Sequence, residues 1–88
     1  GMYGGKEQDV KMLVENHLVG VMIDRFGKDI MMVPVDGKHF SVKVQVHVSR
    51  QFLGWVISLG EGIKIIGPDE VTEQMKQEIK RLVEQYGE

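Results

Sequence analysis

The chain has 88 residues, 42% of them hydrophobic, and a formal net charge of -2. This length supports one hydrophobic core and excludes a second domain, while the balanced charge excludes the clustered basic face that strong binding to duplex DNA requires. Cysteine is absent, which excludes disulfide bonds, thiolate metal sites and a cysteine nucleophile and favours a cytoplasmic location. The longest apolar runs have six residues, whereas a membrane-spanning helix needs roughly 20, so no membrane partner is expected.

Residues 1–8 are predicted to form a disordered tail, and residues 9–87 a single domain. Residues 1–6 show no hydrophobic periodicity. Gly1 before Met2 is typical of the scar that an expression tag leaves after cleavage. The sequence therefore leaves open whether the chain is an excised domain or a complete protein.

Periodicity and capping residues predict the first two elements of the domain. Alternation of apolar and polar residues predicts a strand over 9–15. Asn16 is expected to cap a helix that runs to Phe26, where Gly27 ends it. This helix has a thin polar face, so we expect it to be well buried.

A hairpin of two strands is predicted next, over 30–35 and 39–48. Asp36-Gly37 between them favours the positive φ angles of a type I′ turn. Pro34 cannot donate a ladder hydrogen bond, which places the first strand at an edge or at a bulge. The second strand alternates clearly, so one side is expected to face the core and the other to face solvent or a partner. Its polar side consists of Ser41, Lys43, Gln45 and His47.

The second half of the chain repeats this order of elements. Ser49 is expected to cap a helix over 50–59, which Gly60 ends, and a short strand over 63–66 follows. A helix over 69–86 then finishes the domain with one apolar stripe. The stripe consists of Val71, Met75, Ile79, Leu82, Val83 and Tyr86.

The order β-α-β, β-α-β and a terminal helix predicts the α+β class. Right-handed crossovers place both inner helices on the same face of a four-stranded antiparallel sheet. The expected fold is therefore a ferredoxin-like βαββαβ sandwich with an additional C-terminal helix.

Residues with the spacing of a catalytic or metal site are not found. His39 and His47 share a strand and a face, but they would lie roughly 26 Å apart and could not ligate one metal. Gly60 and Gly62 follow a helix and precede a strand, which is the reverse of the order in a phosphate-binding loop. We therefore expect no enzyme activity, no cofactor and no metal.

Two functional families share this order of elements and are not matched by the residues. Acylphosphatases bind phosphate with a loop and an arginine after the first strand, but Arg25 comes too late after the nearest glycine. RNA-recognition motifs stack bases on aromatic side chains of the central strands. The open face of the long strand has no aromatic residue, so base stacking is weakly supported.

The segment from Trp55 to Pro68 reads WVISLGEGIKIIGP, and a charged amphipathic helix ending in LVEQY follows it. This pattern resembles the C-terminal extension domain, called WCX, of WYL-type bacterial transcriptional regulators. In that family a helix ending in tryptophan, a few apolar residues and a glycine turns into a strand closed by proline. The resemblance covers about residues 9–86, and the ferredoxin-like fold of the family agrees with the order of elements.

The resemblance implies a regulatory, dimer-forming module at the end of a DNA-binding transcription factor. Such regulators carry a winged helix-turn-helix and a central WYL domain, whose DNA-binding and ligand-sensing residues have no positions in this chain. We therefore expect no specific DNA binding by this fragment. The expected partners are a second copy, in a homodimer, and the other domains of the parent regulator. The alternative hypothesis is a small-molecule sensor that binds an unknown effector and acts as a dimer.

The candidate interaction surface combines an open sheet face with two helix residues. Lys43, Gln45 and His47 lie on a sheet face that no predicted element covers, and Arg50 follows them directly. Trp55 lies at the margin of the buried stripe of its helix. One interpretation of Trp55 is partial burial against the final helix, and the other is an interface anchor.

Overall fold

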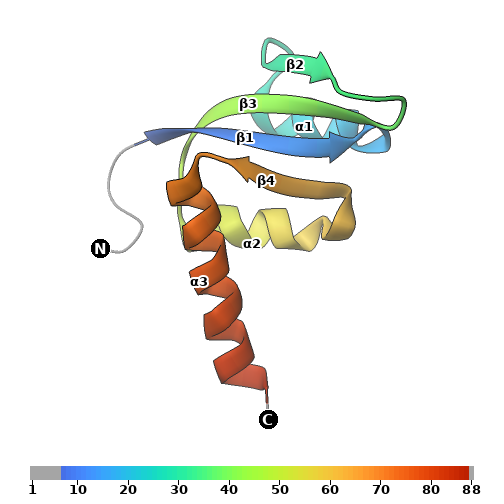
Figure 1. Cartoon of the computed structure of the whole chain (residues 1–88). Helices are drawn as coiled ribbons and strands as arrows, with labels where there is room; N and C mark the ends of the chain where they lie inside the picture. Colours follow the sequence, from blue (N-terminus) through green and yellow to red (C-terminus); the bar gives the residue numbers. More distant parts are fainter. Residues whose placement is uncertain (1–6, 88) are drawn as a thin grey trace.

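The computed structural model describes residues 7–87, so the expected scar and residues 1–6 of the expected tail lie outside the described residues. Four strands and three helices follow one another in the predicted order (Figure 1). Strand β1 begins at Glu7, within the residues that were expected to belong to the tail. The elements are β1 Glu7–Glu15, a 3₁₀ turn Asn16–Leu18, α1 Val19–Phe26, β2 Met31–Pro34, β3 His39–His47, α2 Arg50–Ser58, a 3₁₀ turn Gly60–Gly62, β4 Ile63–Gly67 and α3 Asp69–Tyr86.

The four strands form one antiparallel sheet in the order β2-β3-β1-β4. The central strands β1 and β3 pair along their whole length, from Glu7 opposite His47 to Glu15 opposite His39. Strand β2, which ends at Pro34, lies at an edge as the missing N–H predicts. This topology confirms the α+β, ferredoxin-like arrangement with an added C-terminal helix.

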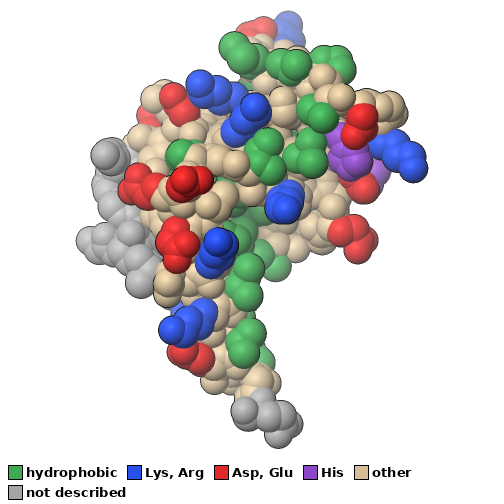
Figure 2. Space-filling view, viewed as in Figure 1, with side chains coloured by type: hydrophobic (Ala, Val, Ile, Leu, Met, Phe, Trp, Pro, Cys, Tyr) green, Lys and Arg blue, Asp and Glu red, His purple; other side chains and the backbone are tan. Residues whose placement is uncertain are grey.

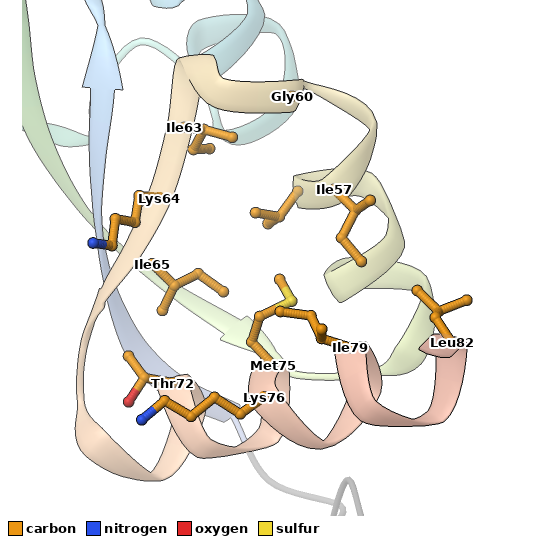
Figure 3. Close-up of a pocket in the computed structure, with 11 residues that line it drawn as sticks. Ile57, Gly60, Ile63, Lys64, Ile65, Thr72, Met75, Lys76, Ile79 and Leu82 are labelled. Carbon is orange, nitrogen blue, oxygen red and sulfur yellow. The ribbon is translucent and has the colours of Figure 1, made fainter. Parts of the chain in front are cut away.

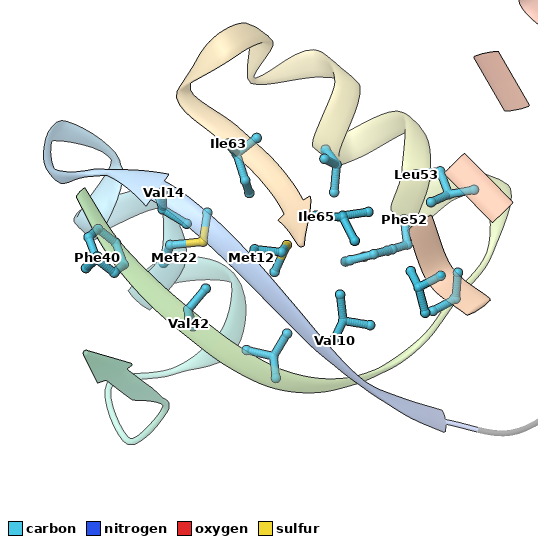
Figure 4. Close-up of a cluster of buried hydrophobic side chains, with 14 residues drawn as sticks. Val10, Met12, Val14, Met22, Phe40, Val42, Phe52, Leu53, Ile63 and Ile65 are labelled. Carbon is cyan, nitrogen blue, oxygen red and sulfur yellow. The ribbon is translucent and has the colours of Figure 1, made fainter. Parts of the chain in front are cut away.

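One face of the sheet carries the hydrophobic core, and α1 and α2 cover that face (Figure 4). Alternate residues of β1 and β3 point into the core. Met12 of β1, Val42 of β3 and Leu53 of α2 are each at most 1% exposed. Burial of each such side chain contributes ~1.5–3 kcal/mol. The core consists of Val10, Met12, Val14, Met22, Phe40, Val42, Val44, Val48, Phe52, Leu53, Val56, Ile63, Ile65 and Val71.

Helix α1 is less buried than its apolar composition predicts. Met22 is its one fully buried residue, and Val19 remains 41% exposed. The expected cap was also wrong, because the Asn16 side chain donates a 3.2 Å hydrogen bond to the carbonyl oxygen of Gly37 in the β2–β3 connection. A 3₁₀ turn precedes α1, whereas Gly27, with φ 93°, ends the helix as expected.

The β2–β3 connection does not use the expected type I′ turn. Gly37 lacks the positive φ angle that this turn requires. A carboxylate oxygen of Asp36 instead accepts hydrogen bonds from the backbone N–H groups of Lys38 and His39, at 2.7 and 2.8 Å. The hydrogen bond from Lys38, followed by that from the His39 side chain, lowers the pKa of Asp36. An aspartate side chain therefore shapes this loop.

Helix α2 begins and ends as the sequence predicts. The Ser49 hydroxyl accepts a 3.1 Å hydrogen bond from the backbone N–H of Phe52 and caps the helix. Gly60 follows the helix with φ 65°, a conformation that glycine adopts without steric cost. Gly62 is buried, and a Cβ atom there would lie 2.6 Å from Cδ1 of Leu18. These two glycines return the chain from α2 into β4.

Helix α3 packs against the rest of the domain along its first half. Val71 is completely buried, and Met75 packs partly buried against the core. The exposed fractions then rise to 49% at Ile79, 62% at Val83 and 79% at Tyr86. Figure 1 shows the C-terminal half of α3 projecting beyond the sheet and α2. The predicted apolar stripe exists, but its second half does not face the core of this chain.

Candidate functional site

An apolar groove lies between α2, β4 and α3, and we call it the α2–α3 groove (Figure 3). Its volume of about 540 Å³ lies within the ~300–1,000 Å³ typical of binding pockets. Ile57 of α2, Ile65 of β4 and Met75 of α3 all contribute to the lining. Lys64 and Lys76 also line the groove and give it positive charge. The complete lining is Val56, Ile57, Gly60, Ile63, Lys64, Ile65, Thr72, Met75, Lys76, Ile79 and Leu82.

Helix α3 is longer than the strand β4 that it packs against. The 18 residues of α3 span ~27 Å, whereas the 5 residues of β4 span ~17 Å. Helical spacing keeps the apolar residues on one face along the whole helix, so the overhanging half is apolar too. Ile79 lines the groove, and the exposed Val83 and Tyr86 extend α3 beyond it.

A buried carboxylate holds α3 against the beginning of α2. The Glu78 side chain is 3% exposed, and its Oε1 accepts a 2.6 Å hydrogen bond from Nε of Arg81. The other oxygen, Oε2, lies 3.0 Å from Nε of Arg50. The hydrogen bond from Arg81 lowers the pKa of Glu78, burial opposes this change, and the charge of Arg50 adds to it. Two arginines thus stabilise an ionised carboxylate where α3 meets α2.

Comparison with protein families agrees with this fold. The model of the WCX domain matches residues 6–83 of the chain. The chain belongs to the WCX domain family. The WCX match includes the Trp55–Pro68 segment, so the resemblance is confirmed. Membership makes the chain a regulator-associated C-terminal domain of a family that is not known for catalysis. None of the curated proteins compared with this WCX domain matches it.

The WCX domain does not bring the five expected contact residues onto one surface. Lys43, Gln45 and His47 are exposed on the sheet face opposite the core. Arg50 is held by its ion pair at the beginning of α2, and Trp55 is half-buried in the layer of helices. A role for any of these residues in partner binding stays a prediction.

Trp55 packs between α1 and α2 and not, as expected, against the final helix. Its ring meets Phe26 edge-on with 5.4 Å between centroids, and Phe52 lies 6.1 Å away. The guanidinium of Arg25 stands 4.8 Å from the ring centroid, in the geometry of a cation–π contact. The next residue, Val56, lines the α2–α3 groove. Trp55 and Val56 therefore lie on different sides of α2, and Trp55 lies on the side that faces α1.

The apolar stripe that the sequence predicts for α3 does not by itself reveal the groove of this WCX domain. Ile57 and Ile79 keep helical spacing with buried neighbours, yet they are 41% and 49% exposed. The length of the helix could have indicated exposed apolar residues. A helix of 18 residues is longer than a strand of 5 residues, so part of its apolar face extends beyond that strand. Periodicity shows which face is apolar, and length shows how much of that face the domain itself can bury.

Acidic and histidine side chains are dispersed over the part of the WCX domain that is described. Across residues 7–87, no group of three or more His, Asp or Glu side chains could hold a metal ion. The same range holds no helix with the length and apolar character to cross a membrane. His17 pairs with Glu15 at 2.9 Å and His39 with Asp36 at 3.0 Å. Glu15 is the last residue of β1, and His39 is the first residue of β3.

Proposed function

We propose that this WCX domain is the regulatory and association domain of a WYL-type helix-turn-helix transcriptional regulator, and that two copies associate through their α2–α3 grooves. The observation that carries the proposal is the exposed second half of α3 beside that groove. In a symmetric pair, the projecting apolar helix of each copy can pack against the apolar groove of the other, since each copy supplies both surfaces.

An antiparallel pairing of two α3 helices fits the spacing of their apolar residues. With the twofold axis between residues 80 and 81, Ile79 of one copy meets Leu82 of the other, and Met75 meets Tyr86. Lys76 of each copy then comes to the level of Gln85 of its partner.

The predicted association of the isolated domain is weak. Ile79, Val83 and Tyr86 are 49%, 62% and 79% exposed. Incomplete burial of each at the pair contributes about 1 kcal/mol, or ~6 kcal/mol for both copies together. Association costs ~4–15 kcal/mol in lost translational, rotational and side-chain freedom. Contacts of Ile57 and Met75 in the groove must contribute further favourable free energy for the two copies to associate. We expect a Kd of ~0.01–1 mM. In a complete regulator, further contacts raise the effective concentration of the two domains.

Sedimentation equilibrium of the chain, at concentrations up to ~1 mM, tests this proposal. The Val83→Asp variant places a charge in the proposed interface and should raise the Kd by at least ~10-fold. Val35→Asp is the matched control, because Val35 is 54% exposed at the β2–β3 connection and Val83 is 62% exposed. A monomer at the highest concentration, or equal effects of the two variants, would contradict association through α3.

The genomic reading frame upstream of Met2 tests the wider assignment to a transcriptional regulator. In-frame helix-turn-helix and WYL domains are the expected finding. A translation start at Met2 would contradict the assignment.

A further inference from the structure

A shallow trough crosses the sheet face that lies opposite the core. Its volume is about 500 Å³. Met31 and Val33 of edge strand β2 line one end, and Gly67 and Pro68 line the other. Ser41, which is 8% exposed, lies in register with Val33 and also lines the trough. Apolar walls and a polar floor are thus combined in one concave surface.

Two lysines stand directly opposite each other in this trough. Lys11 of β1 and Lys43 of β3 are register partners, and both side chains are exposed. Neither belongs to any of the ion pairs among residues 7–87. Like charges directly opposite each other on neighbouring strands destabilise a sheet. A negatively charged group between the two ammonium groups would remove this repulsion.

The apolar side chains of β2 give the trough its second property. Met31 is 65% exposed and Val33 is 49% exposed, on the face of the sheet that also carries the lysines. A sheet face that is exposed only to water normally carries polar residues. Figure 2 shows hydrophobic side chains beside lysine and arginine side chains across this side of the molecule. The surface therefore offers apolar contact next to positive charge.

Asp9 limits the charge of the occupant. Its carboxylate lines the same trough, two residues before Lys11 on the same face of β1. A polyanion such as a nucleic acid strand would meet this carboxylate as well as the net charge of -2. A ligand with a single acidic group can lie between Lys11 and Lys43 and avoid Asp9.

We propose that the trough binds a small organic acid with an apolar body. The carboxylate lies between Lys11 and Lys43, and the body rests on Met31 and Val33. A volume of about 500 Å³ suits a ligand of this size. This site uses neither α3 nor the α2–α3 groove, so the inference is independent of the proposed self-association.

Titration of the ¹⁵N-labelled chain with octanoate, followed by amide NMR shifts, tests the proposal. Octan-1-ol, which lacks the charge, and acetate, which lacks the apolar body, are the matched probes. We expect octanoate to shift amides of β1, β2 and β3 and to bind at least ~10-fold more tightly than either probe. Lys11→Met and Lys43→Met should each weaken octanoate binding ~5-fold.

Lys76→Met is the control for the variants, because Lys76 lines the α2–α3 groove and not the trough. A further variant, Lys43→Glu, separates binding from folding. It replaces the repulsion across from Lys11 with attraction, so we expect a higher urea midpoint together with loss of octanoate binding. Octanoate shifts confined to α2 and α3, wild-type binding by both lysine variants, or no shifts at all would overturn the proposal.

Discussion

Removing the charge of Glu78 tests how α3 is held against α2. Its side chain is 3% exposed, while the partner Arg50 at 3.0 Å is 57% exposed and therefore partly screened by water. Breaking a fully buried ion pair costs ~3–5 kcal/mol, and an exposed pair contributes ~0.2–1 kcal/mol. This pair lies between the two cases, so we expect a coupling free energy of about 1 kcal/mol between Glu78 and Arg50.

A double-mutant cycle of Glu78→Gln and Arg50→Met, measured by urea unfolding, isolates this coupling. Glu78→Gln should also lower the Tm by ~4–8 °C for each kcal/mol lost in a domain of this size. Glu84→Gln on the same helix is the matched control, because Glu84 is exposed. Additivity of the two substitutions within ~0.3 kcal/mol, or equal effects of Glu78→Gln and Glu84→Gln, would refute the assigned role of Glu78.

The pH dependence of the same variant follows from the lowered pKa of Glu78. A carboxyl group whose pKa is lower in the folded than in the unfolded state stabilises the fold above its unfolded pKa. For Glu78 this contribution is present above the ordinary value of 4.5 and is lost as the pH falls through the folded pKa. We therefore expect the stability difference between wild type and Glu78→Gln to be full at neutral pH and to shrink in acid. A difference that grows below pH 4.5 would contradict this sign.

Three further stability predictions are checked by urea unfolding followed by circular dichroism. Leu53→Ala should cost ~2–5 kcal/mol because it opens a cavity in the core, whereas Ile57→Ala on the same helix should cost less than ~1 kcal/mol because that side chain is 41% exposed. Ser49→Ala removes the cap of α2 and should cost ~1 kcal/mol. Gly60→Ala forces a Cβ atom into the φ 65° conformation and should cost ~1–2 kcal/mol. If Leu53→Ala and Ile57→Ala had equal effects, the assigned burial would be wrong.

The order of elements, the sheet and most of the core could be predicted from local sequence patterns. Alternation along β3 showed which side faces the core, because successive strand residues point to opposite faces. Ser49 and Gly27 were identified correctly because the hydrogen bonds of this cap and this helix stop are made with residues three and four positions away in the chain. Pro34 indicated an edge strand for the same reason, since its missing N–H is a local property.

The parts that could not be predicted depend on residues far apart in the chain. Asn16 would cap a helix in isolation, but its amide hydrogen-bonds to Gly37, 21 residues away. Arg50 was assigned to an open contact surface, and its ion pair with Glu78 depends on where α3 crosses α2. The α2–α3 groove could not be predicted from the spacing of the apolar residues in α3. That spacing is the same whether the apolar stripe packs against its own domain or remains exposed.

The position of the single tryptophan has a practical consequence for studying this domain. The ring of Trp55 contacts Phe26, Phe52 and Arg25, which all belong to α1 and α2. Residues that line the trough and the exposed half of α3 are not among these ring partners. Tryptophan emission therefore reports on the packing of α1 against α2. Octanoate binding or pairing of α3 should leave that emission nearly constant, whereas unfolding should change it.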